Sequence, residues 1–149
     1  METATQPQVS SPSAAENAAQ EIVFREGIIG VPRAQRFLLL EREGHVARVL
    51  KCLDIEGFAL PVVDPLLFDP EYKPALGKRF ARVIELETDD PVVLLAVATL
   101  EPGGPMANLR APLVINARNR RAMQVILESR SYPLRAPMVV KTPEVEPAD

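Results

Sequence analysis

The chain has 149 residues, of which 47% are hydrophobic, 25% are charged and 5% are aromatic. This composition is that of one globular domain with an aliphatic core, and it excludes a chain too polar to fold. The net charge of −3 and the pI of about 5.3 exclude a general attraction for nucleic acid or an anionic membrane.

The two ends of the chain differ in composition from its middle. Residues 1–20 are rich in Ala, Gln, Ser, Thr and Pro without an apolar period, and residues 141–149 are similar. Such segments cannot bury enough apolar surface to offset the entropy lost on folding. The sequence therefore predicts a disordered leader over residues 1–20, a folded domain over residues 21–140 and a disordered tail over residues 141–149.

The sequence carries no feature that directs a chain to a membrane or to an oxidising compartment. The first residues lack the basic start and apolar core of a signal peptide. The longest apolar run, residues 91–100, has about half the length of a membrane-spanning helix. Cys52 is the single cysteine and cannot form an internal disulfide. We expect a cytoplasmic protein.

The middle of the chain consists of short apolar runs separated by prolines and glycines. Eleven of the fifteen prolines lie between Pro32 and Pro137, and proline is tolerated at turns and strand edges rather than inside helices. Seven short runs at this spacing predict a mostly β fold, a small antiparallel β-barrel or sandwich-like single domain with one short helix. The predicted strands lie within residues 21–24, 36–42, 45–53, 58–63, 91–100, 112–118 and 122–127.

Two of these runs differ in their patterning. In residues 112–118, Leu113 and Ile115 share one face while Asn116 lies on the other. Residues 91–100 have no polar face at all. We therefore expect residues 91–100 to form a central strand that is buried on both sides or lines the core of a barrel.

One segment has a helical period. Its apolar residues fall at i, i+4, i+7 and i+8, with basic residues on the opposite side, which is typical of a short amphipathic helix. We expect this helix to end before Asp89 and to cover an open end of the barrel. The apolar residues are Leu76, Phe80, Val83 and Ile84, and the basic residues are Lys78, Arg79 and Arg82.

The sequence offers little for catalysis. His45, the single histidine, follows Gly44 and is predicted to lie in a turn, so an enzyme would have to be built around it and nearby carboxylates. Residues 101–109 (EPGGPMANL) contain a glycine pair but no following Gly-Lys-Ser/Thr, which predicts a hairpin loop rather than a P-loop. One Cys and one His are too few for structural zinc. We predict no catalytic residue, metal or cofactor.

Residues 62–72 (VVDPLLFDPEY) are a candidate contact segment. Pro65 and Pro70 bracket three large apolar residues, which either pin the loop to the core or form an exposed patch for a partner. The acidic residues of this segment are too few for a Ca²⁺ loop. The apolar residues are Leu66, Leu67 and Phe68, and the acidic residues are Asp64, Asp69 and Glu71.

Positive charge is concentrated between Ala107 and Arg135. This stretch has six arginines and one acidic residue, whereas residues 1–106 have ten basic and sixteen acidic residues. Residues Asn119 to Arg121 are predicted to form a hairpin turn between two strands. An alternative function is therefore an RNA-binding or other protein-interaction module that uses the turn from Arg118 to Arg121, although the interleaved aromatic residues of single-strand binders are missing.

The stretch ANLRAPLVINARNRRAMQVIL, from Ala107, resembles the signature of the bacterial flagellar assembly factor FliW family. In that family an Ala-Asn-Leu-x-Ala-Pro-hydrophobic-Ile-Asn block is followed, across a basic turn, by Gln-hydrophobic-Ile-Leu. Four other stretches are similar to family blocks in the same order, over about residues 22–138. They are FREGIIG from Phe24, FLLL from Phe37, DPLLFDPEYKPAL from Asp64 and YPLRAPM from Tyr132.

This resemblance implies a chaperone-like regulator with a small β-barrel-like fold and no enzymatic activity. Family members bind cytoplasmic flagellin and bind and antagonise CsrA, an RNA-binding translational repressor, so that flagellin secretion is coupled to flagellin translation. Asp64 departs from the family pattern, which has asparagine before Pro65. We expect a monomer when free, with no direct contact to nucleic acid or membrane.

Because CsrA needs a basic surface for RNA, we expect acidic loops of this chain to meet it. Asn108, Pro112 and Asn116 are expected to fix the geometry of the hairpin, Asn116 by hydrogen bonding. The candidate protein-binding residues are Asp64, Pro65, Leu66, Phe68, Asp69, Glu71, Tyr72, Asn108 and Arg110.

Overall fold

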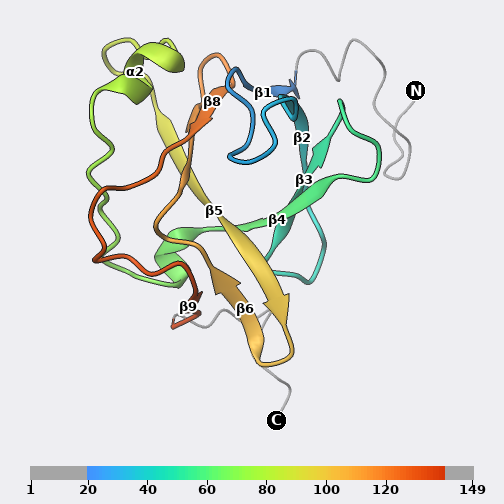
Figure 1. Ribbon diagram of the computed structural model, residues 1–149. Coiled ribbons are helices and arrows are strands. Elements are labelled where there is room, and N and C mark those ends of the chain that lie inside the picture. Colours follow the sequence, from blue (N-terminus) through green and yellow to red (C-terminus); the bar gives the residue numbers. More distant parts are fainter. Residues whose placement is uncertain (1–19, 140–149) are drawn as a thin grey trace.

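The computed structural model describes residues 20–139, so the predicted leader and tail lie outside the described residues apart from Gln20. Most of the strands are short, and β5 is the longest (Figure 1). The strands are β1 (Ile22–Phe24), β2 (Arg36–Leu40), β3 (Arg48–Cys52), β4 (Ala59–Val63), β5 (Val92–Glu101), β6 (Gly104–Ala107), β7 (Leu113–Asn116), β8 (Arg121–Gln124) and β9 (Ala136–Pro137). A 3₁₀ turn, η1 (Pro65–Leu67), and a short helix, α2 (Arg79–Val83), lie between β4 and β5.

The strands form a ring. Their order is β4-β3-β2-β1-β8-β7-β5, and the ring closes because β4 also pairs with β5 at Val62–Val97 and Val63–Ala96. The β1–β8 pair is parallel, while the other pairings are antiparallel. β6 and β9 extend the second half of β5 into a ribbon below the ring (Figure 1). The predicted small β-barrel is thus confirmed, and its strands are largely antiparallel, with β1–β8 as the parallel pair.

The ring is filled by apolar side chains that alternate along its strands. Phe24 and Phe37 meet edge to face in the centre, with ring centroids 5.4 Å apart. Such aromatic pairs add stability beyond the area they bury. The buried side chains of this central cluster are Ile22, Phe24, Ile28, Ala34, Phe37, Leu50, Cys52, Val62, Leu95, Leu113, Ile115 and Ala122.

The helix covers the outside of the ring rather than its open end. Leu113 and Ile115 of β7 point into the ring, and Val114 points outward from it. Phe80 of α2 and Ile84, which follows the helix, pack against this outward side chain. The expected lid is therefore wrong, and the helix is also shorter than the periodic segment suggested. An amphipathic period fixes which side of a helix is buried but not which surface it is buried against.

β5 matches its prediction only in the middle. Leu95 and Val97 face the central cluster, and Ala96 and Ala98 are buried beneath the loops on the other side. The alternative prediction, a strand that lines the core of the barrel, is therefore confirmed at Leu95 and Val97. The two ends of the strand are exposed, so the prediction of burial is wrong there. The residues concerned are Val92, Val93, Thr99 and Leu100.

Sequence reasoning missed β6 and β9. β6 forms the returning arm of the predicted 101–109 hairpin, with Pro105 opposite Leu100. β9 adds Ala136 and Pro137 at the edge of the same ribbon. Proline cannot donate a ladder hydrogen bond and argues against a strand in a sequence, but it is tolerated at an edge such as this one.

A buried asparagine joins the β7–β8 hairpin to the segment before β5. The Nδ2 of Asn116, a fully buried residue, donates to the carbonyl of Ile84 (3.1 Å) and to Oδ2 of Asp90 (3.2 Å). Its Oδ1 accepts from the backbone N–H of Arg118 at 3.0 Å. Since buried polar groups are costly unless bonded, this side chain fixes three segments at once. The expected role of Asn116 in the hairpin is confirmed.

We predict that Asn116→Ala lowers the free energy of unfolding by about 2–4 kcal/mol. The change leaves the Arg118 N–H without its partner, removes one of the two amide donors to the Ile84 carbonyl and opens a small cavity. Urea denaturation measures the loss. The matched control is Asn119→Ala in the same turn, where the side chain is only half-buried, and a larger loss in that variant would contradict the account.

Asp90 adds a pH dependence to this region. The backbone N–H of Glu87 and then the guanidinium of Arg118 hold the pKa of Asp90 below its ordinary value of 3.8. A carboxylate with a lowered pKa contributes stability above its unfolded pKa and loses it as the pH falls toward the folded pKa. We therefore expect the stability gap between wild type and Asp90→Asn to be full at neutral pH and to shrink below about pH 3.8.

Chemical denaturation at a series of pH values between 2 and 7 checks this expectation about Asp90, with Asp89→Asn as the control for removing a carboxylate from the same turn. A stability gap between wild type and Asp90→Asn that stayed constant down to pH 2 would contradict it.

Candidate functional site

The segment after β4 is a compact loop with its own internal bonds. Asp64 caps η1, accepting through Oδ1 from the backbone N–H of Leu66 at 3.0 Å. Asp69 repeats the arrangement with the N–H of Glu71, also at 3.0 Å. Both are side-chain-to-backbone turns of the kind that Asp favours. The loop is therefore ordered locally by its acidic residues.

Small residues on the sheet make room for this loop. Ala96 and Ala98 of β5, with Ala107 and Ala136 of the ribbon, form a surface on which Phe68 and Tyr72 pack. Phe68 is 3% exposed. The sequence left open whether the apolar residues of this loop pin it to the core or form an exposed patch. Phe68 does the first, and Leu66, which is 48% exposed, is available for the second.

Tyr72 joins the loop to the signature block. Its hydroxyl donates to the carbonyl of Leu109 at 2.7 Å, and its ring meets that of Tyr132 edge to face at 4.7 Å. Burial, followed by the neighbouring Tyr132, raises the pKa of Tyr72 well above its usual range. The phenol therefore stays protonated and acts as a hydrogen-bond donor.

Asn108 and Arg110 shape the neighbouring turn. Oδ1 of Asn108 accepts from the N–H groups of Arg110 (3.0 Å) and Ala111 (3.2 Å), which confirms its predicted role in fixing geometry. Nε of Arg110 donates to the carbonyl of Tyr132 at 2.9 Å. The structure thus brings the two predicted groups of contact residues together through Tyr72, Leu109 and Tyr132.

The predicted contact residues fall into two groups by exposure. Pro65, Phe68 and Tyr72 are buried and hold the loop in place. The others present at least part of their side chains to solvent, so they are the ones that can touch a partner without rearrangement. Asp64, Leu66 and Glu71 are exposed, and Asp69, Asn108 and Arg110 are half-buried.

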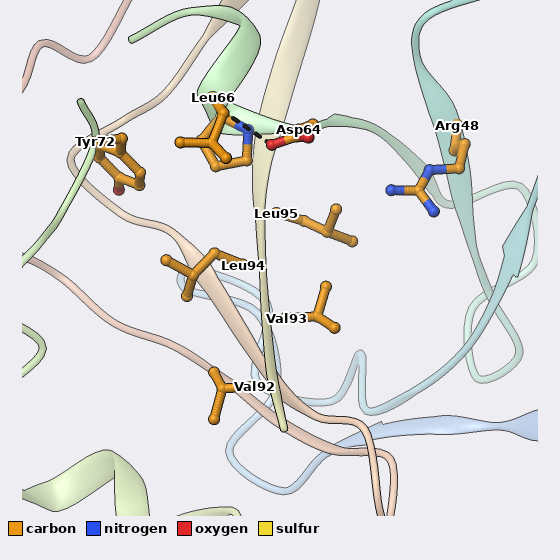
Figure 2. Close-up of a pocket in the computed structure, with 9 residues that line it drawn as sticks. Arg48, Asp64, Leu66, Tyr72, Val92, Val93, Leu94 and Leu95 are labelled. Atoms are coloured by element: carbon orange, nitrogen blue, oxygen red, sulfur yellow. Dashed lines mark hydrogen bonds between the residues drawn. The ribbon is translucent and has the colours of Figure 1, made fainter. Parts of the chain in front are cut away.

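A groove of about 330 Å³ lies beside Asp64 (Figure 2), and we call it the Asp64 groove. The first half of β5 runs through it, with Val93 and Leu95 on the side that faces Arg48 and Val92 and Leu94 on the other side. Sequence reasoning missed this contribution because the run was expected to be buried. The lining residues are Arg48, Asp64, Pro65, Leu66, Tyr72, Val92, Val93, Leu94 and Leu95.

A second and more apolar depression of about 400 Å³ lies around Arg110, and we call it the Arg110 hollow. Sequence reasoning missed its exposed apolar residues, Ile29, Ile126 and Leu134, because they come from segments far apart in the chain and Ile126 falls within the predicted strand 122–127. Its lining residues are Ile28, Ile29, Leu60, Val97, Asn108, Arg110, Ala111, Gln124, Ile126 and Leu134.

The groups proposed for other chemistry are dispersed or already paired. His45 is exposed in the β2–β3 loop. Among residues 20–139 no three His, Cys, Asp or Glu side chains are grouped so that they could hold a metal ion. Arg118 of the predicted RNA-binding turn pairs through Nε with Asp90 at 2.8 Å. No helix within the described range is long and apolar enough to cross a membrane.

Fold and surface together define a class, a small β-barrel domain whose notable surface features are two apolar depressions with polar margins. Comparisons with known proteins give the family. A family model described as FliW protein matches residues 7–138. The flagellar assembly factor FliW of Thermotoga neapolitana is 35% identical over 120 residues, which cover 78% of this chain and 80% of that protein.

The flagellar assembly factor FliW of Syntrophus aciditrophicus is 32% identical over 117 residues, covering 76% of this chain and 74% of that protein. A crystal structure of the flagellar assembly factor FliW has the same fold, with a TM-score of 0.73 at 24% identity over 83% of this chain and 88% of that one. The chain belongs to the FliW family of flagellar assembly factors, which are not enzymes.

We predict that two substitutions in the 64–72 loop differ in their effect on stability. Tyr72→Phe removes the bond to the Leu109 carbonyl and should lower the free energy of unfolding by about 1–2 kcal/mol. Leu66→Ala, at a half-exposed position, should change stability by less than about 0.5 kcal/mol. Urea denaturation compares the two variants, and an equal loss in both would contradict the division into buried and accessible residues.

Proposed function

We propose that this chain acts in the cytoplasm as a partner-switching regulator that binds flagellin as a chaperone-like partner and binds and antagonises CsrA. Membership of the FliW family supports this, as does the agreement of several sequence blocks with the family pattern. In this role the chain couples flagellin secretion to flagellin translation, because it is free to sequester CsrA once flagellin has left.

The observation that carries the CsrA half of the proposal is the character of the Asp64 groove. Its lining has one acid, Asp64, and one base, Arg48, which is paired with Glu41 at 3.6 Å. Its apolar wall includes the exposed Leu66 and Val93. Glu71 adds a second exposed carboxylate on the same loop. A partner that binds RNA has a basic surface, so these acids favour encounter and the apolar wall supplies area to bury.

Direct RNA binding by the Arg118–Arg121 turn has weaker support. Arg118 is held by Asp90 and also lies 3.7 Å from a carboxylate oxygen of Glu87. These acids reduce the positive potential that phosphate contacts require.

Isothermal titration of the purified chain against CsrA and flagellin from the same cell tests the proposal. We expect saturable binding to both proteins and no affinity for flagellin mRNA at low salt. Failure to bind either protein would overturn the proposed function and leave the fold assignment intact, whereas salt-sensitive binding to RNA alone would favour the alternative.

We predict that Asp64→Asn combined with Glu71→Lys slows association with CsrA by about 3- to 10-fold at low salt. Asparagine keeps the cap on η1 because its Oδ1 still accepts from the Leu66 N–H, so the change acts through charge. Stopped-flow or surface plasmon resonance measures the rate. The matched control is Glu43→Gln with Glu56→Lys, two exposed acids outside the groove.

The control pair changes the net charge by the same amount and should leave most of the association rate in place. An equal effect of both pairs would assign the steering to overall charge instead of the groove, and an unchanged rate in the first pair would remove the acidic loop from the proposal.

A further inference from the structure

We propose that the Arg110 hollow is the docking site for an amphipathic α-helix of flagellin that carries an acidic residue beside its apolar face. The inference rests on the proposed function, because it takes flagellin as a partner, and it assigns that partner to a surface separate from the Asp64 groove.

The hollow exposes large apolar side chains from three separate segments. Ile29 is 49% exposed, Ile126 is 62% exposed and Leu134 is 55% exposed, and all three line the same depression. Grouped exposed apolar residues around a concavity are typical of protein-binding sites. Their burial by a partner is the main source of affinity expected here.

The hollow is held in shape before any partner arrives. Gly27 has a φ of +74°, and a Cβ there would meet the Pro32 carbonyl oxygen at 2.2 Å, so only glycine fits this turn. The turn buries Ile28 and leaves Ile29 outward. Gln124 ties two walls together, accepting from the Ile29 N–H at 3.0 Å and donating to the Ala111 carbonyl at 3.2 Å. A preformed site reduces the entropy lost on binding.

The backbone of the hollow favours a helical occupant. The Ile29 N–H and the Ala111 carbonyl are engaged by Gln124, and the Val97 carbonyl accepts from the Asn108 N–H at 2.9 Å. At these points the hollow therefore has no free backbone N–H or C=O group with which an added strand could form hydrogen bonds. A helix satisfies its own backbone and presents apolar side chains at i, i+3, i+4 and i+7, which suits an apolar depression.

The charge at the margin selects the partner. Nε of Arg110 is bonded to the Tyr132 carbonyl, and within residues 20–139 no carboxylate lies within ion-pair distance of its guanidinium. Its two terminal nitrogens can therefore take a carboxylate in a bidentate pair. A positive margin disfavours a basic surface such as that expected of CsrA and favours a segment that carries an acidic residue, which we assign to flagellin.

Full-length chain variants test the site. Ile126→Asp and Leu134→Asp place a charge in the hollow at exposed positions, where folding is little affected, and each should weaken flagellin binding by about 30-fold or more. Leu100→Asp, at a position that is 55% exposed and outside the hollow, is the matched control and should bind flagellin as wild type does. CsrA affinity of all three variants should stay within about 2-fold.

Overlapping 20-residue peptides that span flagellin then identify the occupant by fluorescence anisotropy. We expect one bound peptide that gains helical circular dichroism, and we expect Arg110→Glu to abolish its binding and an acid-to-lysine change in the peptide to restore it. Unchanged flagellin affinity in Ile126→Asp, loss of CsrA binding instead, or a peptide bound as a strand would overturn the docking site. Wild-type chain that binds no flagellin would instead overturn the proposed function and this inference with it.

Discussion

The fold depends on the pairing of β5 with three other strands. Within ten residues this strand pairs with β7 over Val92–Leu95, with β4 at Ala96 and Val97, and with β6 over Ala98–Glu101. Its middle is covered on both faces, because one face lines the central cluster and the other lies under the 64–72 loop. The middle of a strand with these contacts must be apolar, as Leu95, Ala96, Val97 and Ala98 are. The Asp64 groove arises where the first half of this strand is left partly uncovered.

The shapes of the two proposed binding surfaces depend on how the 64–72 loop and the turn at Leu109 are attached to the sheet. The alanines of β5 and the ribbon let Phe68 and Tyr72 approach the sheet closely, and Tyr72 then holds the Leu109 turn. That turn orients Arg110 at the edge of the second depression. The Asp64 groove and the Arg110 hollow are therefore joined by one network of contacts, and we propose that they bind different partners.

Much of the fold could be predicted from the sequence. Every predicted strand region overlaps an observed strand, because alternation and proline spacing are local properties. The role of Asn116 was also predictable, since an asparagine in an apolar run must find hydrogen-bond partners. β6 and β9 were missed because Pro105 and Pro137 argue against strands unless the edge position is known. The family followed from the ordered blocks around Ala107.

The sequence by itself thus determined the strand-forming segments, the central apolar pattern and the family, all of which depend on residue type and near neighbours. Only the tertiary structure decided exposure. It placed α2 on the outside of the ring, buried Phe68 and left Leu66 accessible two residues away. It also gathered Ile29, Ile126 and Leu134 from distant segments into one depression. The physical reason is that burial depends on which other segments lie over a side chain, and no local pattern contains that information.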